Sequence, residues 1–315
     1  METRKSFITK TAFAAAAIAL PVEELISAVK EYPPMKTKNP QKALIIWYSQ
    51  TGHTRRIGMI LEKAWEKKGI KVDALDYRRV DKEKMASYDL IAIGTPVYYL
   101  DVPGNVREWL ASIPEIKGTP VASFVTFGGK GDNQHNTACT LLELLAAKGG
   151  VPVAHGLFGN MSTYAPTWSM GNEKRTLKFR HLPNRDTYNQ ARNYAADILA
   201  GVSGGKSIAI DTRVEAGSLF KHFPQIGFSK LLIGNHYVDK DKCIMCRRCE
   251  RNCPVNAIHP AAGNVEKKKC ILCMGCVNNC PAGAVVMTMM GKKIYSFKEL
   301  LNQNKIVIEE PAELI

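Results

Sequence analysis

The sequence predicts a doubly wound, five-stranded parallel α/β sheet followed by a small, cysteine-rich α+β domain. Two observations carry this prediction. Between residues 43 and 202, short apolar runs rich in strand formers alternate with segments of helical periodicity, which is typical of a parallel sheet covered by helices. Farther along, eight of the nine cysteines fall between residues 243 and 280, in two copies of one spacing.

The five predicted strands are apolar runs that are too short for a helix to be the better interpretation. They span 43–50, 70–75, 89–94, 120–127 and 151–158. Helices are predicted between the strands, because apolar residues recur at helical spacing from Ile57 until Gly69. Further helices are predicted over 105–111, 136–148 and 186–200. Such a sheet binds its ligand at the carboxyl ends of the strands.

Three loops at those carboxyl ends carry distinctive residues. They are Ser49-Gln50-Thr51-Gly52-His53-Thr54 after the first strand, Thr95-Pro96-Val97-Tyr98-Tyr99 after the third, and Phe127-Gly128-Gly129 after the fourth. The first loop leads into a helix, so its backbone N–H groups and hydroxyls favour an anion. The sequence lacks both Gly-x4-Gly-Lys-Ser/Thr and Gly-x-Gly-x2-Gly, so neither a P-loop nor a Rossmann dinucleotide site is predicted.

With these loops in these positions, the chain resembles the flavodoxin-like family, which binds FMN at this edge of the sheet. The resemblance implies that the ribityl phosphate is held by Ser49, Thr51, Gly52, His53 and Thr54. It implies that the isoalloxazine is lined on one side by Thr95, Pro96, Val97, Tyr98 and Tyr99, and approached at its other edge by Phe127, Gly128 and Gly129. Tyr98 or Tyr99 could stack on the flavin, and ordinary loop packing is the alternative for both.

Both cysteine runs read C-x2-C-x2-C-x3-C-P, the bacterial-type ligand run for a [4Fe–4S] cluster, in which the fourth cysteine ligates the cluster of the other run. We therefore assign a first-run cluster to Cys243, Cys246, Cys249 and Cys280. We assign a second-run cluster to Cys270, Cys273, Cys276 and Cys253. It follows that replacing Cys253 should damage the second-run cluster and not the first.

Zinc and disulfide bonds are the alternatives for these cysteines. Zinc prefers two separated pairs of ligands, and disulfides need an oxidising compartment and no doubled spacing. Residues 243–258 match residues 270–285 at 8 of 16 positions, which indicates two half-domains related by pseudo-twofold symmetry. The stretch resembles the two-cluster bacterial ferredoxins. The ninth cysteine, Cys139, is interpreted as a buried core thiol.

The chain of 315 residues divides into five predicted segments: a leader and spacer (1–42), a flavodoxin-like domain (43–202), a connector (203–235), a two-cluster ferredoxin domain (236–290) and a C-terminal tail (291–315).

Residues 1–21 resemble a twin-arginine export leader with Lys5 in place of the second arginine, so export is one expectation and a cytoplasmic protein the other. The aromatic residues of the connector favour docking over a flexible tether. No apolar run reaches the ~20 residues of a membrane span.

Taken together, residues 43–290 resemble the flavodoxin–ferredoxin fusion proteins. The resemblance implies electron transfer between a low-potential redox partner, two [4Fe–4S] clusters and FMN. One alternative is a flavin-dependent reductase of a small organic substrate, and another is an iron–sulfur module with an empty flavodoxin scaffold. The net charge of +14 is partly offset by such cofactors, so nucleic acid is not an expected partner. Arg247, Arg248 and Arg251 suggest an acidic redox partner near the first run, and simple solvation of these charges is the alternative.

Overall fold

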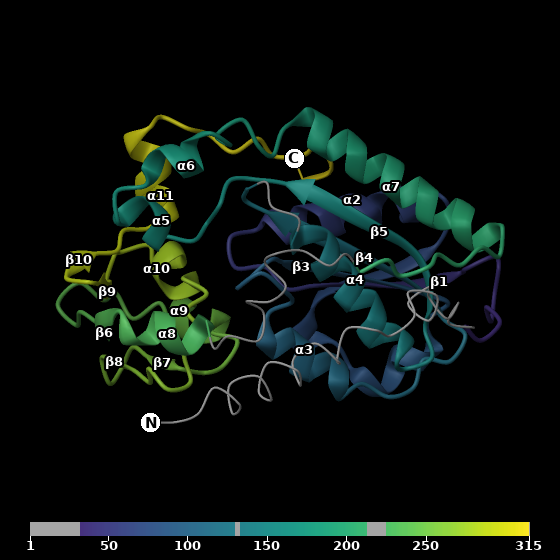
Figure 1. Cartoon of the computed structure of the whole chain (residues 1–315), viewed down its shortest axis with the longest axis horizontal. Coiled ribbons are helices and arrows are strands. Elements are labelled where there is room, and N and C mark those ends of the chain that lie inside the picture. The colour runs from purple at the N-terminus through teal and green to yellow at the C-terminus, as the bar shows by residue number, and fades with distance from the viewer. Residues whose placement is uncertain (1–31, 130–132, 213–224, 315) are drawn as a thin grey trace, which may run out of the picture. The chain divides into compact units, whose positions relative to one another are not determined.

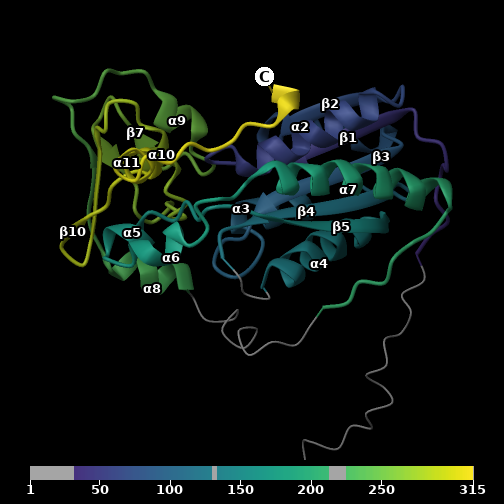
Figure 2. The same cartoon turned by 90° about the horizontal axis from the view of Figure 1, so that it is seen from above.

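Five parallel strands form the first sheet of the computed structural model, which describes residues 32–129, 133–212 and 225–314. The strands are β1 (Lys42–Trp47), β2 (Lys71–Asp76), β3 (Leu90–Pro96), β4 (Pro120–Phe127) and β5 (Val151–Gly159). They pair in the order β2-β1-β3-β4-β5. Figure 1 labels β1, β3, β4 and β5, and Figure 2 labels all five strands. The predicted five-stranded parallel sheet is confirmed, and this strand order is one of the two common doubly wound arrangements.

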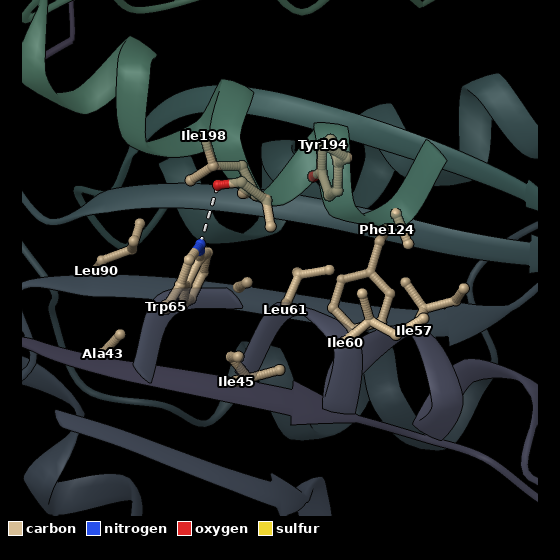
Figure 3. Close-up of a cluster of buried hydrophobic side chains, with 14 of the residues drawn as sticks. Ala43, Ile45, Ile57, Ile60, Leu61, Trp65, Leu90, Phe124, Tyr194 and Ile198 are labelled. Carbon is tan, nitrogen blue, oxygen red and sulfur yellow. Dashed lines mark hydrogen bonds between the residues drawn. The ribbon is translucent and has the colours of Figure 1, made fainter. Parts of the chain in front are cut away.

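Helices cover both faces of this sheet (Figure 2). On one face, α2 (His53–Glu66) and α7 (Arg185–Ser203) pack against β-strand side chains such as Ile45. The other face is covered by α3 (Gly104–Ala111) and α4 (Asn133–Ala146). In the first core, the indole N–H of Trp65 donates to the carbonyl of Ala195 over 3.0 Å and so ties α2 to α7 (Figure 3). Two 3-10 turns, Tyr77–Arg79 and Lys82–Ser87, lie between β2 and β3.

A second, antiparallel sheet carries the cysteine-rich segment. Its order is β10-β9-β6-β8-β7, formed by β6 (Ile233–Val238), β7 (Ile258–His259), β8 (Asn264–Val265), β9 (Val285–Met289) and β10 (Lys292–Lys293). One short helix follows the second cysteine of each run: α9 (Arg248–Asn252) and α10 (Gly275–Asn279). The four antiparallel strand pairs of this sheet, together with the two short helices, fit the predicted small α+β domain.

The segment after β5 contains two short helices that the sequence did not predict, α5 (Pro166–Ser169) and α6 (Glu173–Leu177). Met161, Ala165 and Trp168 pack into the core of the second sheet, not of the first. The Trp168 indole N–H donates to the Tyr295 carbonyl over 3.1 Å. This segment therefore belongs to the interface between the two sheets.

The tail after the second sheet returns to the first. It forms α11 (Phe297–Gln303), capped by a reciprocal Ser296–Glu299 box, and a last 3-10 turn at Ala312–Leu314. Glu310 pairs with Arg56 of α2, and Glu313 pairs with Arg192 of α7 at 2.6 Å. The tail thus bonds to both helices on one face of the first sheet.

The remaining predictions concern the ends of the chain and the connector. The predicted leader, residues 1–21, lies outside the described residues, as do Leu219, Phe220 and Phe223 of the connector. What is described of the connector includes Ile208, whose N–H donates to the carbonyl of Pro152, and α8 (Gln225–Leu231). No helix within the described residues is long and apolar enough to cross a membrane.

Candidate functional site

Two cavities in the cysteine-rich half are each lined by four cysteines. Cys243, Cys246, Cys249 and Cys280 line one cavity. Cys253, Cys270, Cys273 and Cys276 line the other. Each cavity joins three cysteines of one run to the last cysteine of the other, so the geometry has the crossover that the ligand assignment requires.

Backbone N–H groups around the cysteines donate hydrogen bonds to cysteine sulfurs. The N–H of Ala257 donates to Cys253 Sγ, and the N–H of Ala284 donates to Cys280 Sγ, both over 3.2 Å. Arg247 and Met274, equivalent residues of the two runs, have positive φ angles of 54° and 59°. Non-glycine residues rarely adopt this conformation, so each run is wound tightly in the same way. These donors fit the thiolates of a [4Fe–4S] cluster, and all nine cysteines are free of disulfide bonds.

Burial makes the second cavity a poor place for unbound thiolates. It raises the pKa of the Cys273 thiol to about 12 and that of Cys276 well above its usual value. Burial is likewise the main cause of the raised pKa of Cys270. A cationic iron core would compensate for this cost, because ligating thiols are deprotonated by the metal they bind.

A cleft of about 650 Å³ lies at the carboxyl ends of the first sheet. Its walls include seven of the eight residues implied to contact the isoalloxazine, together with the neighbouring Thr126 and Leu100. The seven are Pro96, Val97, Tyr98, Tyr99, Phe127, Gly128 and Gly129. Thr95 lies beneath the cleft, fully buried and with no hydrogen-bond partner for its hydroxyl among the described residues.

The cleft's far wall comes from residues outside the three loops that follow β1, β3 and β4. Ser162, Thr163 and Tyr164 follow β5, Phe228 lies on α8, and Cys273 belongs to the second cavity. Gly128 has a structural reason for lacking a side chain, because a Cβ there would lie 2.3 Å from the Ser162 Cα. Cys273 therefore lines both the cleft and the second cysteine cavity.

The loop implied to hold the phosphate adjoins this cleft without lining it. Gly52 precedes α2 with φ 92°, and Thr54 Oγ1 lies 2.8 Å from Thr126 Oγ1 at the cleft wall. Both ring nitrogens of the buried His53 lack hydrogen-bond partners among the described residues. Burial, reinforced by Arg56, lowers the pKa of His53 to about 3. Unpartnered donors at a helix N-terminus fit an anion, so the residues present fit the phosphate of FMN.

The same loop also forms the junction with the cysteine-rich half. The side-chain amide of Gln50 donates to the Tyr48 hydroxyl over 3.1 Å and to the carbonyl of Asn252 over 3.3 Å. The Asn279 amide donates to the Gln50 carbonyl over 2.7 Å. Asn252 and Asn279 are equivalent residues of the two runs, and both therefore bond to Gln50.

Two tyrosines lie between the cleft and the second cavity. The rings of Tyr48 and Tyr98 meet edge to face, with their centroids 5.9 Å apart. Burial and the neighbouring Cys273 both raise the pKa of Tyr98. Sequence reasoning missed Tyr48 and Gln50 because neither fits a ligand motif. The one available signal was their position, at the carboxyl end of the first predicted strand.

The two runs differ sharply in exposure. Ile244 and Met245 of the first run are 66% and 47% exposed, and the flanking Arg247 and Arg248 are also exposed. In the second run, Leu272, Met274 and Gly275 are buried. The second cavity therefore faces the cleft and the first cavity faces outward.

Comparison with known proteins divides the chain in the same place. Residues 44–163 match a family model described as a flavodoxin domain. Residues 236–259, which include the first cysteine run, match a model described as a 4Fe-4S binding domain. A flavodoxin of Clostridium saccharobutylicum is 28% identical over 127 residues, which cover 39% of this chain and 79% of that protein.

Solved flavodoxin structures resemble the same half. An archaeal flavodoxin has a TM-score of 0.38 and 18% identity, covering 51% of this chain and 98% of its own. Flavodoxin 1 from Bacillus cereus has a TM-score of 0.39 and 14% identity, covering 50% of this chain and 97% of its own.

Proposed function

Because the chain joins a flavodoxin domain to a 4Fe–4S ferredoxin domain, we propose that it transfers electrons between a low-potential redox partner, two [4Fe–4S] clusters and FMN. The observation that carries the proposal is the position of Cys273, which lines both the second cysteine cavity and the cleft. When bound, the clusters supply one-electron transfer and the flavin supplies one- and two-electron transfer.

In this proposal the flavin lies in the cleft of the first sheet. Its phosphate is held at the loop that ends on α2, where both ring nitrogens of His53 lack hydrogen-bond partners among the described residues and Gly52 allows the backbone to turn. Tyr98 and Tyr99 form the wall of the cleft after β3, and Phe127 and Gly129 form the wall after β4. The remaining residues proposed to hold FMN are Ser49, Thr51, Thr54, Thr95, Pro96, Val97 and Gly128.

The number of clusters is also part of the proposal. Two cavities, each with four cysteines and a backbone N–H donating to its crossover sulfur, support two clusters per chain. The first-run cluster is held by Cys243, Cys246, Cys249 and Cys280. The second-run cluster is held by Cys270, Cys273, Cys276 and Cys253.

The redox partner is proposed to dock on the exposed loop of the first run. Ile244 and Met245 offer an apolar contact there, and the exposed Arg247, Arg248 and Arg251 surround it with positive charge. Such a surface steers an acidic protein toward the cluster nearest to solvent. The second-run cluster then stands between this entry point and the flavin.

A flavin-dependent reductase of a small organic substrate is the second candidate, and the outer part of the cleft favours it. Arg175 of α6 and Phe228 of α8 line the cleft beyond the loops of the sheet. An aromatic wall with an exposed guanidinium suits a planar, anionic organic molecule.

Anaerobic purification followed by iron, sulfide and flavin analysis tests the proposal. We expect about eight iron atoms and one FMN per chain, because each bacterial-type run serves one cubane. Iron without flavin would instead support the empty-scaffold alternative. Rapid reoxidation of the reduced flavin by a soluble quinone, without any protein acceptor, would support the reductase.

A further inference from the structure

His236 of β6 is a buried side chain in contact with a proposed cluster ligand. It is 6% exposed, lines the second cysteine cavity, and its Nε2 lies 3.6 Å from Cys276 Sγ. Its Nδ1 is buried and has no hydrogen-bond partner among the described residues. Since the sulfur is the acceptor within reach, the proton of a neutral imidazole belongs on Nε2, where it points to Cys276.

Tyr48, at the end of β1, makes an equivalent contact from the other half of the chain. It is fully buried, and its hydroxyl oxygen accepts from the Gln50 amide over 3.1 Å. Its own proton is therefore left to donate, and the Cys273 side chain is the neighbouring acceptor. Gln50 thus sets the direction in which the Tyr48 hydroxyl donates.

The equivalent sulfurs of the first run lie in different surroundings. The repeat pairs Cys273 with Cys246 and Cys276 with Cys249. Burial raises the pKa of Cys249, and backbone groups of Glu250 and Cys249 donate to its sulfur. Among the described residues, the lining of the first-run cavity includes no tyrosine and no histidine. Side-chain donors from Tyr48 and His236 therefore distinguish the second-run site.

We propose that Tyr48 and His236 are positioning residues that raise the reduction potential of the second-run cluster by donating hydrogen bonds to the sulfurs of Cys273 and Cys276. The inference rests on the proposed function, since it requires that a cluster occupy this cavity. Reduction adds an electron and increases the negative charge on the ligand sulfurs, and a donor stabilises the more negative state. Burial opposes that charge, so the two donors offset the cost of placing the cluster beside the cleft.

Potentiometric titration of the full-length holoprotein, followed by electron paramagnetic resonance, tests this inference. Tyr48→Phe and His236→Leu each remove one donor and should shift one of the two cluster potentials downward. We expect the oxidised-to-reduced ratio at fixed potential to change about tenfold, which is 59 mV for a one-electron couple. His236→Gln keeps an N–H donor and should restore most of the shift.

Two further variants make the result specific. Tyr77→Phe is the matched control, because Tyr77 is buried and packs edge to face on Tyr48, but its hydroxyl pairs with Asn105. Arg248→Gln with Arg251→Gln removes exposed positive charge beside the first run, so it should lower the other cluster potential. The tyrosine and histidine variants should shift one potential and the arginine variants the other. This difference shows which potential belongs to which cluster.

The inference is overturned if Tyr48→Phe and His236→Leu leave both potentials unchanged, or move the potential that the arginine variants also move. Unaltered iron and flavin content in each variant shows that the site has formed. Failure of the proposed function would differ, because the wild-type protein would then lack one of its two cluster signals or its flavin.

Discussion

The two cysteine runs have the same ligand spacing and opposite surroundings. The repeat aligns Arg247 with Met274 and Arg248 with Gly275. The first member of each pair is exposed, and the second is buried. In a third pair, Arg251 is exposed, whereas Asn278 is half-buried and donates to the Thr163 carbonyl beside the cleft over 2.9 Å. Ligation of a [4Fe–4S] cluster requires the shared spacing of the cysteines. The residues between the cysteines differ because the first run is exposed to solvent and the second is buried.

Under the proposed function, this difference would give each of the two clusters a separate role. An exposed, basic loop can meet a partner and steer it, but a buried loop can only exchange electrons with something already inside the chain. Since that neighbour is the cleft of the flavodoxin domain, the comparison between the runs can be tested by exchanging or damaging their equivalent residues.

The largest expected effect comes from the crossover cysteines. Cys253→Ala should abolish the second-run cluster and leave the first, although Cys253 lies in the first run, because it lines the second cavity. Cys280→Ala is the matched control and should abolish the first-run cluster. Iron content and electron paramagnetic resonance measure both. Loss confined to the first-run cluster in Cys253→Ala would show that the ligands do not cross over.

A bulkier residue at Gly275 should loosen the junction. A Cβ there would lie 2.0 Å from Gln50 Oε1, and Gln50 cannot move aside without breaking its bonds to Tyr48 and Asn252. We expect Gly275→Ala to lower the free energy of unfolding by about 1–3 kcal/mol. Arg248→Ala, at the equivalent exposed position, should change it by less than about 0.5 kcal/mol. Denaturant unfolding that gave equal losses would refute the difference between the runs.

Charge reversal at the first run should slow docking. Arg248→Glu with Arg251→Glu should reduce the association rate of a reduced, acidic ferredoxin about tenfold at low salt, and the loss should shrink as salt screens the charges. Lys68→Glu with Lys71→Glu makes the same change in net charge at exposed positions of the flavodoxin domain. Stopped-flow mixing measures the rate, and an equal loss in both double variants would mean that the protein's overall charge, not this loop, attracts the donor.

The smallest expected effect is on the pH dependence of stability, and it comes from the buried His53 at the start of α2. The ring centroid of His53 lies 6.0 Å from that of Phe297. Its pKa is lowered from 6.5 to about 3, so the neutral form is favoured by folding. The resulting stability is complete above pH 6.5 and declines as the pH falls toward 3. In flavin-depleted protein we expect about 1 kcal/mol to be lost between pH 7.5 and 5.5. His53→Gln should show a flatter profile over this range, and parallel profiles would contradict the lowered pKa.

Much of the fold follows from local pattern. The predicted strand 120–127 coincides with β4, and the helix predicted to end near Gly69 corresponds to α2, which ends at Glu66. These elements have short-range signals, because burial on both faces of a parallel sheet produces apolar runs and an amphipathic helix repeats every 3.6 residues. The cysteine spacing likewise predicted which sulfurs share a cavity.

The rest depends on contacts between distant residues. Helices α5 and α6 have 4 and 5 residues, too short for a periodicity to be visible. In the sequence, nothing distinguishes Gly275 from other glycines. Its importance comes from its contact with Gln50, more than two hundred residues away in the chain. The sequence places Tyr48 in a buried strand. Its hydroxyl can act on the second-run site only because the second cavity lies beside the end of that strand.

We propose that electrons reach the flavin by way of the second-run cluster. Rapid mixing of the oxidised holoprotein with a reduced acidic ferredoxin, with flavin absorbance and freeze-quenched electron paramagnetic resonance followed together, tests it most directly. In Cys253→Ala protein that keeps its flavin and first-run cluster, the first-run signal should still appear while flavin reduction slows at least a hundredfold, on the order of 3 kcal/mol in barrier height. Flavin reduction at the wild-type rate in that variant would contradict the claim.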